Sequence, residues 1–165
     1  MTVISVTSVL CYLAQLGQLN LLRHLFGTVV LPAEVLAECR HPNAPAELRN
    51  ALSDVLPAFI KVQQMTQNLP ETAALDSGDA AAISLAWQHR PDALVLIDER
   101  SGRAIAQALG LRVRGLLALL ADGHRQQFLD LYACNAMLQQ HGFRAASPLL
   151  QSFRRELRLP ESPHE

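Results

Sequence analysis

Three carboxylates stand where the ends of predicted strands could bring them together. Asp98 directly follows the apolar run 94–97, Glu38 lies in a helical segment that follows the β-branched run 28–31, and Asp79 opens another helical segment. Ligands of parallel α/β sheets sit beyond the carboxyl ends of the strands. Carboxylate oxygens are the donors that hard divalent cations prefer. The spacing therefore allows a cation site built from Glu38, Asp79 and Asp98.

Each carboxylate also has a purely structural interpretation. Asp76 is a natural N-cap, and Asp79, three residues later, could act only as the carboxylate of a capping box. Asp98 could serve as a turn or N-cap residue, and Glu38 could be a solvated helix charge. Spacing alone leaves both interpretations open.

The elements that would position these residues alternate along the chain. Short β-branched or apolar runs predict strands, and longer amphipathic runs predict helices. The predicted strands cover residues 3–6, 28–31, 59–63, 94–97 and 112–114. The predicted helices cover residues 9–16, 19–26, 32–38, 46–56, 77–89, 101–109, 116–121, 126–140 and 148–157. This alternation predicts an α/β fold, with a central, mostly parallel sheet and helices on both faces.

Two local features refine this prediction. Thr7 and Ser8 carry hydroxyls suited to cap the first helix. Pro32 suits the first turn of a helix, because its missing N–H would have no partner there.

With 165 residues, we expect a single domain over 1–157 and a C-terminal tail over 158–165.

Composition narrows the function classes. A net charge of -1 gives no overall attraction to nucleic acid, so any RNA site must be local. The three cysteines lack metal-knuckle spacing, and no pair of the six histidines has the i, i+4 spacing of a helical zinc site. No apolar run is long enough for a membrane span, and the first residues do not resemble a secretory leader. We therefore expect a cytoplasmic protein.

Four segments, in order, resemble the motifs of the VapC toxins and the wider PIN-domain family. They are residues 7–10, 31–38, 76–83 and 96–103, and the end at Gly142-Phe143 resembles one bacterial VapC-like branch. The resemblance implies a PIN-like three-layer fold. It also implies that Glu38, Asp79 and Asp98 occupy the family's catalytic metal positions.

The chain departs from this pattern at Val6. The family normally has aspartate, or asparagine in some branches, at that position, and valine cannot bind a metal. Glu99 and Asp76 are possible substitutes, although both could be solvated or capping residues. Ser8 matches the hydroxyl of the motif and could position a water beside the cation.

The resemblance implies a metal-dependent endoribonuclease of the VapC-like toxin type that uses Mg²⁺ or Mn²⁺ and leaves a 5′ phosphate. Its expected partners are an RNA substrate, an antitoxin protein and a second copy of the chain in a homodimer, with no membrane. Arginine forks suit phosphate oxygens, so Arg100 and Arg103 could contact the RNA backbone, with Arg112 and Arg114 nearby.

Two other interpretations stay open. Because of Val6, the chain could be a catalytically degenerate PIN domain that binds RNA or protein. A Rossmann-like nucleotide binder is disfavoured, since no glycine-rich loop follows the first strand.

Overall fold

The computed structural model describes residues 1–140, which fall into two compact units: the first unit is Met1–Leu116, and the second begins at Leu117. The predicted boundary between a domain over 1–157 and a tail lies outside the described residues. So do the predicted helix 148–157 and Gly142-Phe143.

The first unit is built on a five-stranded sheet in which every pairing is parallel. The strands are β1 (Thr2–Ser5), β2 (Val29–Pro32), β3 (Ile60–Gln63), β4 (Ala93–Leu96) and β5 (Arg112–Arg114). They lie in the order β3-β2-β1-β4-β5. This arrangement confirms the predicted α/β fold with a parallel central sheet.

Burial follows position in the sheet. Ile4 of β1 aligns with Val30 of β2 and Val95 of β4, and all four residues of β4 are buried. The edge strands β3 and β5 are more exposed. A parallel strand covered on both faces needs apolar side chains on both, which explains why 94–97 is a continuous apolar run.

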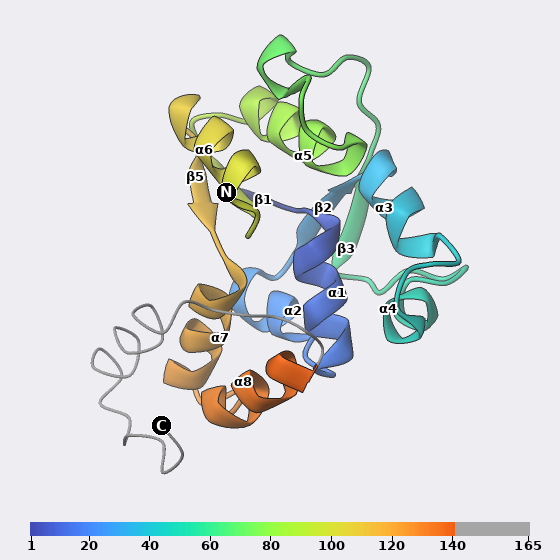
Figure 1. Ribbon diagram of the computed structural model, residues 1–165, viewed down its shortest axis with the longest axis vertical. Coiled ribbons are helices and arrows are strands. Elements are labelled where there is room, and N and C mark those ends of the chain that lie inside the picture. The colour runs from blue at the N-terminus through green and yellow to red at the C-terminus, as the bar shows by residue number, and fades with distance from the viewer. Residues whose placement is uncertain (141–165) are drawn as a thin grey trace. The chain divides into compact units, whose positions relative to one another are not determined.

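The helices of the first unit connect successive strands. They are α1 (Thr7–Gln15), α2 (Leu21–Phe26), α3 (Ala33–Arg40), α4 (Ala46–Ala51), α5 (Ser77–Gln88) and α6 (Arg100–Ala108), with a 3-10 turn at Pro70–Thr72. Right-handed crossovers place connections that run in opposite directions on opposite faces of the sheet. Figure 1 shows α1 and α2 on one side of the strands and α5 and α6 on the other.

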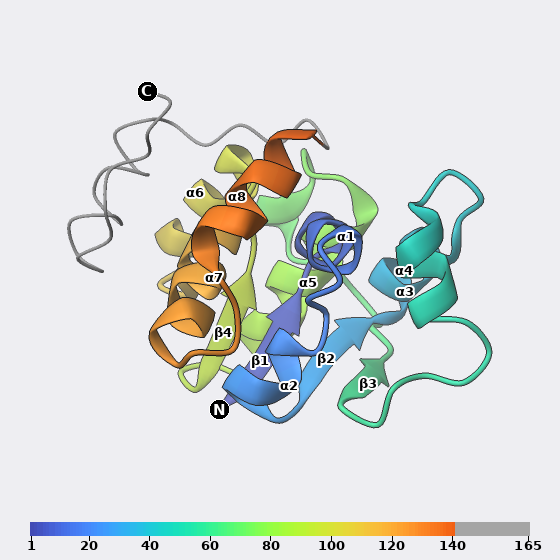
Figure 2. The same ribbon diagram turned by 90° about the horizontal axis from the view of Figure 1, so that it is seen from below.

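The chain changes direction at β1. The connections from β1 to β2 and β3 run one way, and β4 and β5 lie on the other side of β1, as the order of β3, β2, β1 and β4 in Figure 2 shows. Such a switch point is where open α/β sheets bind ligands, at the carboxyl ends of the strands. Val6 and Asp98, which follow β1 and β4, stand at this point.

The starts of two helices test the predicted caps. The side chain of Asp76 accepts a hydrogen bond from the Asp79 amide at 3.0 Å, which confirms Asp76 as the N-cap of α5. The predicted hydroxyl cap of the first helix was wrong, because α1 begins at Thr7 after Val6, without a side-chain cap. The Thr7 hydroxyl donates instead to the Glu38 carboxylate.

Three helix boundaries differ from prediction by four or five residues. α4 ends at Ala51, five residues before the predicted end. α7 (Leu116–Arg125) ends four residues later than predicted, and α8 (Leu131–Gln140) begins at residue 131 instead of 126. Gln127 has a φ of 65°, which no helix continues through, and the Asp130 carboxylate accepts from the amides of Tyr132 and Ala133.

Within the described residues, no helix is both long and apolar enough to cross a membrane.

Candidate active site

Val6 is the junction between β1 and α1. Its side chain is fully buried, and its amide donates to the carbonyl of Leu96 at 3.1 Å. This bond extends the pairing of β1 with β4 by one residue. The side chain at the end of the central strand therefore offers no oxygen to the site.

Glu38 is held by groups from two other helices. Its Oε2 accepts from the Thr7 hydroxyl of α1, and its Oε1 accepts from the Gly78 amide of α5 at 2.8 Å. A Cβ added at Gly78 would lie 2.5 Å and 2.6 Å from the two carboxylate oxygens of Glu38. The glycine before Asp79 thus has a physical role, since a larger residue would displace this carboxylate from its place beside the start of α5.

We expect Gly78→Ala to destabilise the fold by about 1 kcal/mol, because the added methyl group displaces the carboxylate at the end of the Glu38 side chain from its hydrogen bonds to Thr7 and Gly78. Urea unfolding measures the loss, and Ser77→Ala, an exposed neighbour in the same turn, is the matched control. In a Glu38→Ala background the same change should cost much less, because the clashing carboxylate is gone. An equal cost in both backgrounds would show that Glu38 is not the cause.

Asp79 is buried among other carboxylates. Only 8% of the residue is exposed, and burial, a hydrogen bond shared with Glu99 and repulsion from Asp76, Glu99 and Glu38 raise the pKa of Asp79 to about 7. Neighbouring carboxylates that repel one another are relieved either by a proton or by a cation. Asp79 is therefore the carboxylate of the candidate site that its neighbours repel, and the one that a proton or a cation would stabilise.

The Asp98 carboxylate lies among other groups than those that surround Asp79. Its Oδ1 accepts from the Leu116 amide at 3.0 Å, and its Oδ2 is buried with no hydrogen-bond partner among the described residues. Burial raises the pKa of Asp98, while the Leu116 amide and the charge of Arg103 lower it. A Cβ added at Gly115 would lie 2.6 Å from both Asp98 Oδ1 and Arg103 Nη1. Asp98 and Arg103 therefore approach each other over Gly115.

The structure groups Glu99, rather than Asp98, with Asp79. Glu99 is exposed at the start of α6 and interacts with Asp79 by hydrogen bond and by charge. The sequence signal for this part of the site was the acidic pair Asp98 and Glu99 directly after β4. Which of the two interacts with Asp79 depends on which side chain turns toward α5.

Other predicted site residues lie nearby in the chain without being joined to Asp79. Arg100 and Ser8 are exposed, in the first turns of α6 and α1. Arg103 is partly buried, with its Nη1 3.4 Å from the carbonyl oxygen of Ile97. Their proposed roles stay predictions.

The donors at this site suit a hard cation by their chemistry. Within residues 1–140 no three histidine, cysteine, aspartate or glutamate side chains are grouped so that they could hold a metal ion, so the predicted set Glu38, Asp79 and Asp98 stays a prediction. The unpaired Oδ2 of Asp98 and the repulsion around Asp79 are both features that a divalent cation would relieve.

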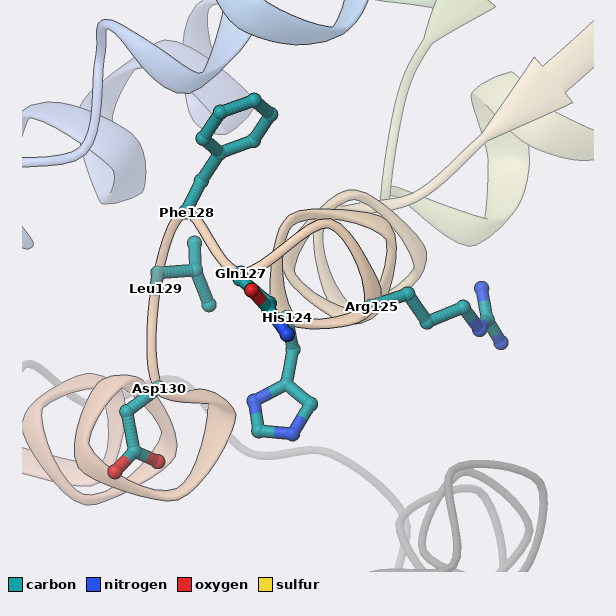
Figure 3. Close-up of a pocket in the computed structure, with 6 residues that line it drawn as sticks. All are labelled: His124, Arg125, Gln127, Phe128, Leu129 and Asp130. Atoms are coloured by element: carbon teal, nitrogen blue, oxygen red, sulfur yellow. The ribbon is translucent and has the colours of Figure 1, made fainter.

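The second unit contains a hollow whose side chains are poorly arranged for chemistry (Figure 3). It measures about 570 Å³ and is lined by His124, Arg125, Gln127, Phe128, Leu129 and Asp130. His124 Nδ1 accepts from the Leu131 amide, and Arg125 pairs with Asp122 at 2.9 Å. Figure 3 shows Phe128 pointing away from both His124 and Arg125. These side chains do not converge on one ligand.

Comparisons with known proteins agree with this architecture. The family described as DUF3368, PIN domain, matches residues 2–158. A PilT N-terminus domain protein from the hyperthermophilic archaeon Sulfolobus solfataricus has a similar fold, with a TM-score of 0.51 and 14% sequence identity over 74% of this chain and 92% of that one. No curated protein matches the chain.

Proposed function

The chain belongs to the PIN domain family, and from this premise we propose that it is a metal-dependent endoribonuclease of the VapC-like toxin type. PIN domains are generally nuclease-like. One observation carries the proposal: the buried carboxyl of Asp79, at the start of α5, is repelled by the carboxylates of both Glu38 and Glu99, and this raises the pKa of Asp79. Hard oxygen donors in a shared, partly buried site are what a cation-dependent hydrolase of phosphodiesters needs.

In this proposal Mg²⁺ or Mn²⁺ is held by Glu38 and Asp79, together with the acidic pair Asp98 and Glu99 after β4. When bound, such a cation activates water and neutralises charge that develops on the phosphodiester. Thr7 orients Glu38, and the Gly78 amide fixes its second oxygen. Arg100, exposed at the start of α6, is the arginine best placed to meet an RNA phosphate, because Arg103 already faces Asp98.

A binding-only PIN domain is the second candidate, and two observations favour it. Val6, at the position where the resemblance implies a metal ligand, is a buried apolar side chain, and no group of three potential metal ligands is assembled within residues 1–140. Loss of a metal ligand lowers affinity, rate or both. The two candidates differ in whether RNA is cut or only bound.

We also propose an antitoxin partner and a homodimer. Of the leucines in and between the first two helices, Leu16 and Leu22 are buried, whereas Leu19, in the connection before α2, and Leu25, in α2, are partly exposed. Partly exposed leucines in this segment suit an interface between two copies. Light scattering at micromolar concentration should give twice the chain mass, and a single monomer species would contradict the dimer.

The proposed activity is tested by incubating the full chain with end-labelled single-stranded RNA and Mn²⁺. We expect slow cleavage that a chelator abolishes and that Asp79→Asn lowers at least 100-fold, roughly the loss of several kcal/mol of transition-state stabilisation. Equal cleavage in the variant would show that the site around Asp79 does not cut the RNA. RNA that is retained but not cut would favour the binding-only candidate.

A further inference from the structure

An open hollow adjoins Glu38 on the side of α1 and α3. Its volume is about 490 Å³, and it is lined by Thr7, Cys11, Ala37, Glu38, His41, Asn43, Ala44 and Pro45. α1 packs against both α3 and α4, and the lining residues between these two helices belong to the loop 41–45. The hollow therefore shares one wall, Glu38 with Thr7, with the candidate active site.

The loop offers a polar edge with fixed hydrogen-bonding capacity. His41 Nδ1 accepts from the Asn43 amide at 3.0 Å, so in the neutral ring Nε2 carries the proton and acts as a donor. The side-chain amide of Asn43, an exposed residue, adds one acceptor and two donors. Both residues line the hollow, whose remaining surface is mainly carbon.

The charges of the lining residues limit which chemical groups can bind in the hollow. Among the eight lining residues, all within the described chain, none is lysine or arginine, and Glu38 contributes a carboxylate. A phosphate would find no cation and would be repelled. Ala37, Ala44 and Pro45 instead supply carbon surfaces against which a flat neutral group can pack.

We infer that this hollow receives one unstacked base of a single-stranded RNA, with Asn43 and His41 reading the base edge. The inference rests on the proposed function, because it places the base beside the phosphodiester site that Glu38 borders. Proteins read single-stranded RNA by splaying bases out and bonding their edges, and an asparagine side chain can form two hydrogen bonds to one base edge. The hollow would thus set the sequence preference of cleavage.

Ala37→Leu tests the inference directly. Ala37 is exposed on α3 and lines the hollow, so leucine fills space there without removing a carboxylate or a helix-forming residue. Ala108→Leu, an exposed alanine of α6 outside the hollow, is the matched control. Binding of adenosine, cytidine, guanosine and uridine to each full-length protein is followed by NMR titration, and circular dichroism checks that each variant folds.

We expect Ala37→Leu to weaken nucleoside binding by about tenfold or more, and Ala108→Leu to leave it unchanged. Asn43→Leu should change the ranking of the four nucleosides. Absence of nucleoside binding by the unmodified chain, or unchanged binding by Ala37→Leu, would overturn the inference.

Cleavage separates this inference from the proposed function. If the chain cuts no RNA but binds nucleosides, and Ala37→Leu removes that binding, the base-binding role of the hollow is supported and the nuclease activity is refuted. Cleavage whose sequence preference is the same with and without Ala37→Leu would support the nuclease and refute the hollow.

Discussion

Asp79→Asn is expected to stabilise the protein at pH 8 by as much as about 4 kcal/mol when no divalent cation is present. The carboxyl is buried beside Glu99, Asp76 and Glu38, and its pKa is raised from 3.8 to about 7. A rise of that size corresponds to about 4 kcal/mol. Asparagine has nearly the same shape, stays uncharged at every pH, and its amide can still donate to Glu99.

The sign of the pH dependence follows from linkage. With a pKa raised on folding, Asp79 keeps its proton in the folded chain and loses it in the unfolded chain between about pH 4 and pH 7. The wild type should therefore lose stability as pH rises through this range, whereas Asp79→Asn should lose much less. Urea unfolding in a chelator at pH 5 and pH 8 measures the difference. Asp54→Asn, at an exposed position, is the control, and an equal pH dependence in wild type and Asp79→Asn would refute the assignment.

The second large effect is expected at Val6. If this fully buried side chain faces the carboxylates, Val6→Asp supplies a further carboxylate to the proposed cation site and adds a fourth negative charge near Asp79. The variant should then be several kcal/mol less stable than wild type in a chelator, with that loss largely reversed by Mn²⁺. If Val6 only packs in the core, the loss should be as large but metal should not reverse it.

Val6→Asn separates charge from capping in this experiment. Val6 occupies the N-cap of α1 without a side-chain bond, so either aspartate or asparagine could gain a cap. Asparagine brings no charge and should show little response to Mn²⁺. Thermal melts of the three proteins, with and without Mn²⁺, give the comparison, and an equal metal response in all three would contradict the vacant-ligand account.

Much of the fold could be predicted from local patterns because those patterns reflect burial directly. The run 94–97 is apolar throughout because β4 is covered on both faces, and the start of α5 follows from the Asp76 cap. The predicted start of α8 failed because periodicity continues through Gln127, whose backbone leaves the helical region.

The candidate site was harder to predict because it depends on side-chain direction. Sequence spacing places Asp98 and Glu99 together after β4, but only packing decides that Glu99 turns to Asp79 while Asp98 bonds to the Leu116 amide. The contact of Glu38 with Thr7 and Gly78 joins residues 31 and 40 positions away in sequence. Such contacts leave no periodic signal.

Titration of Mn²⁺ into the full chain, followed by electron paramagnetic resonance of the free ion, tests most directly whether these carboxylates form a cation site. The account predicts saturable binding by wild type, at least tenfold weaker binding by Asp79→Asn, roughly the cost of losing a liganding carboxylate, and tighter binding by Val6→Asp. No saturable binding by wild type, or equal binding by wild type and Asp79→Asn, would contradict it.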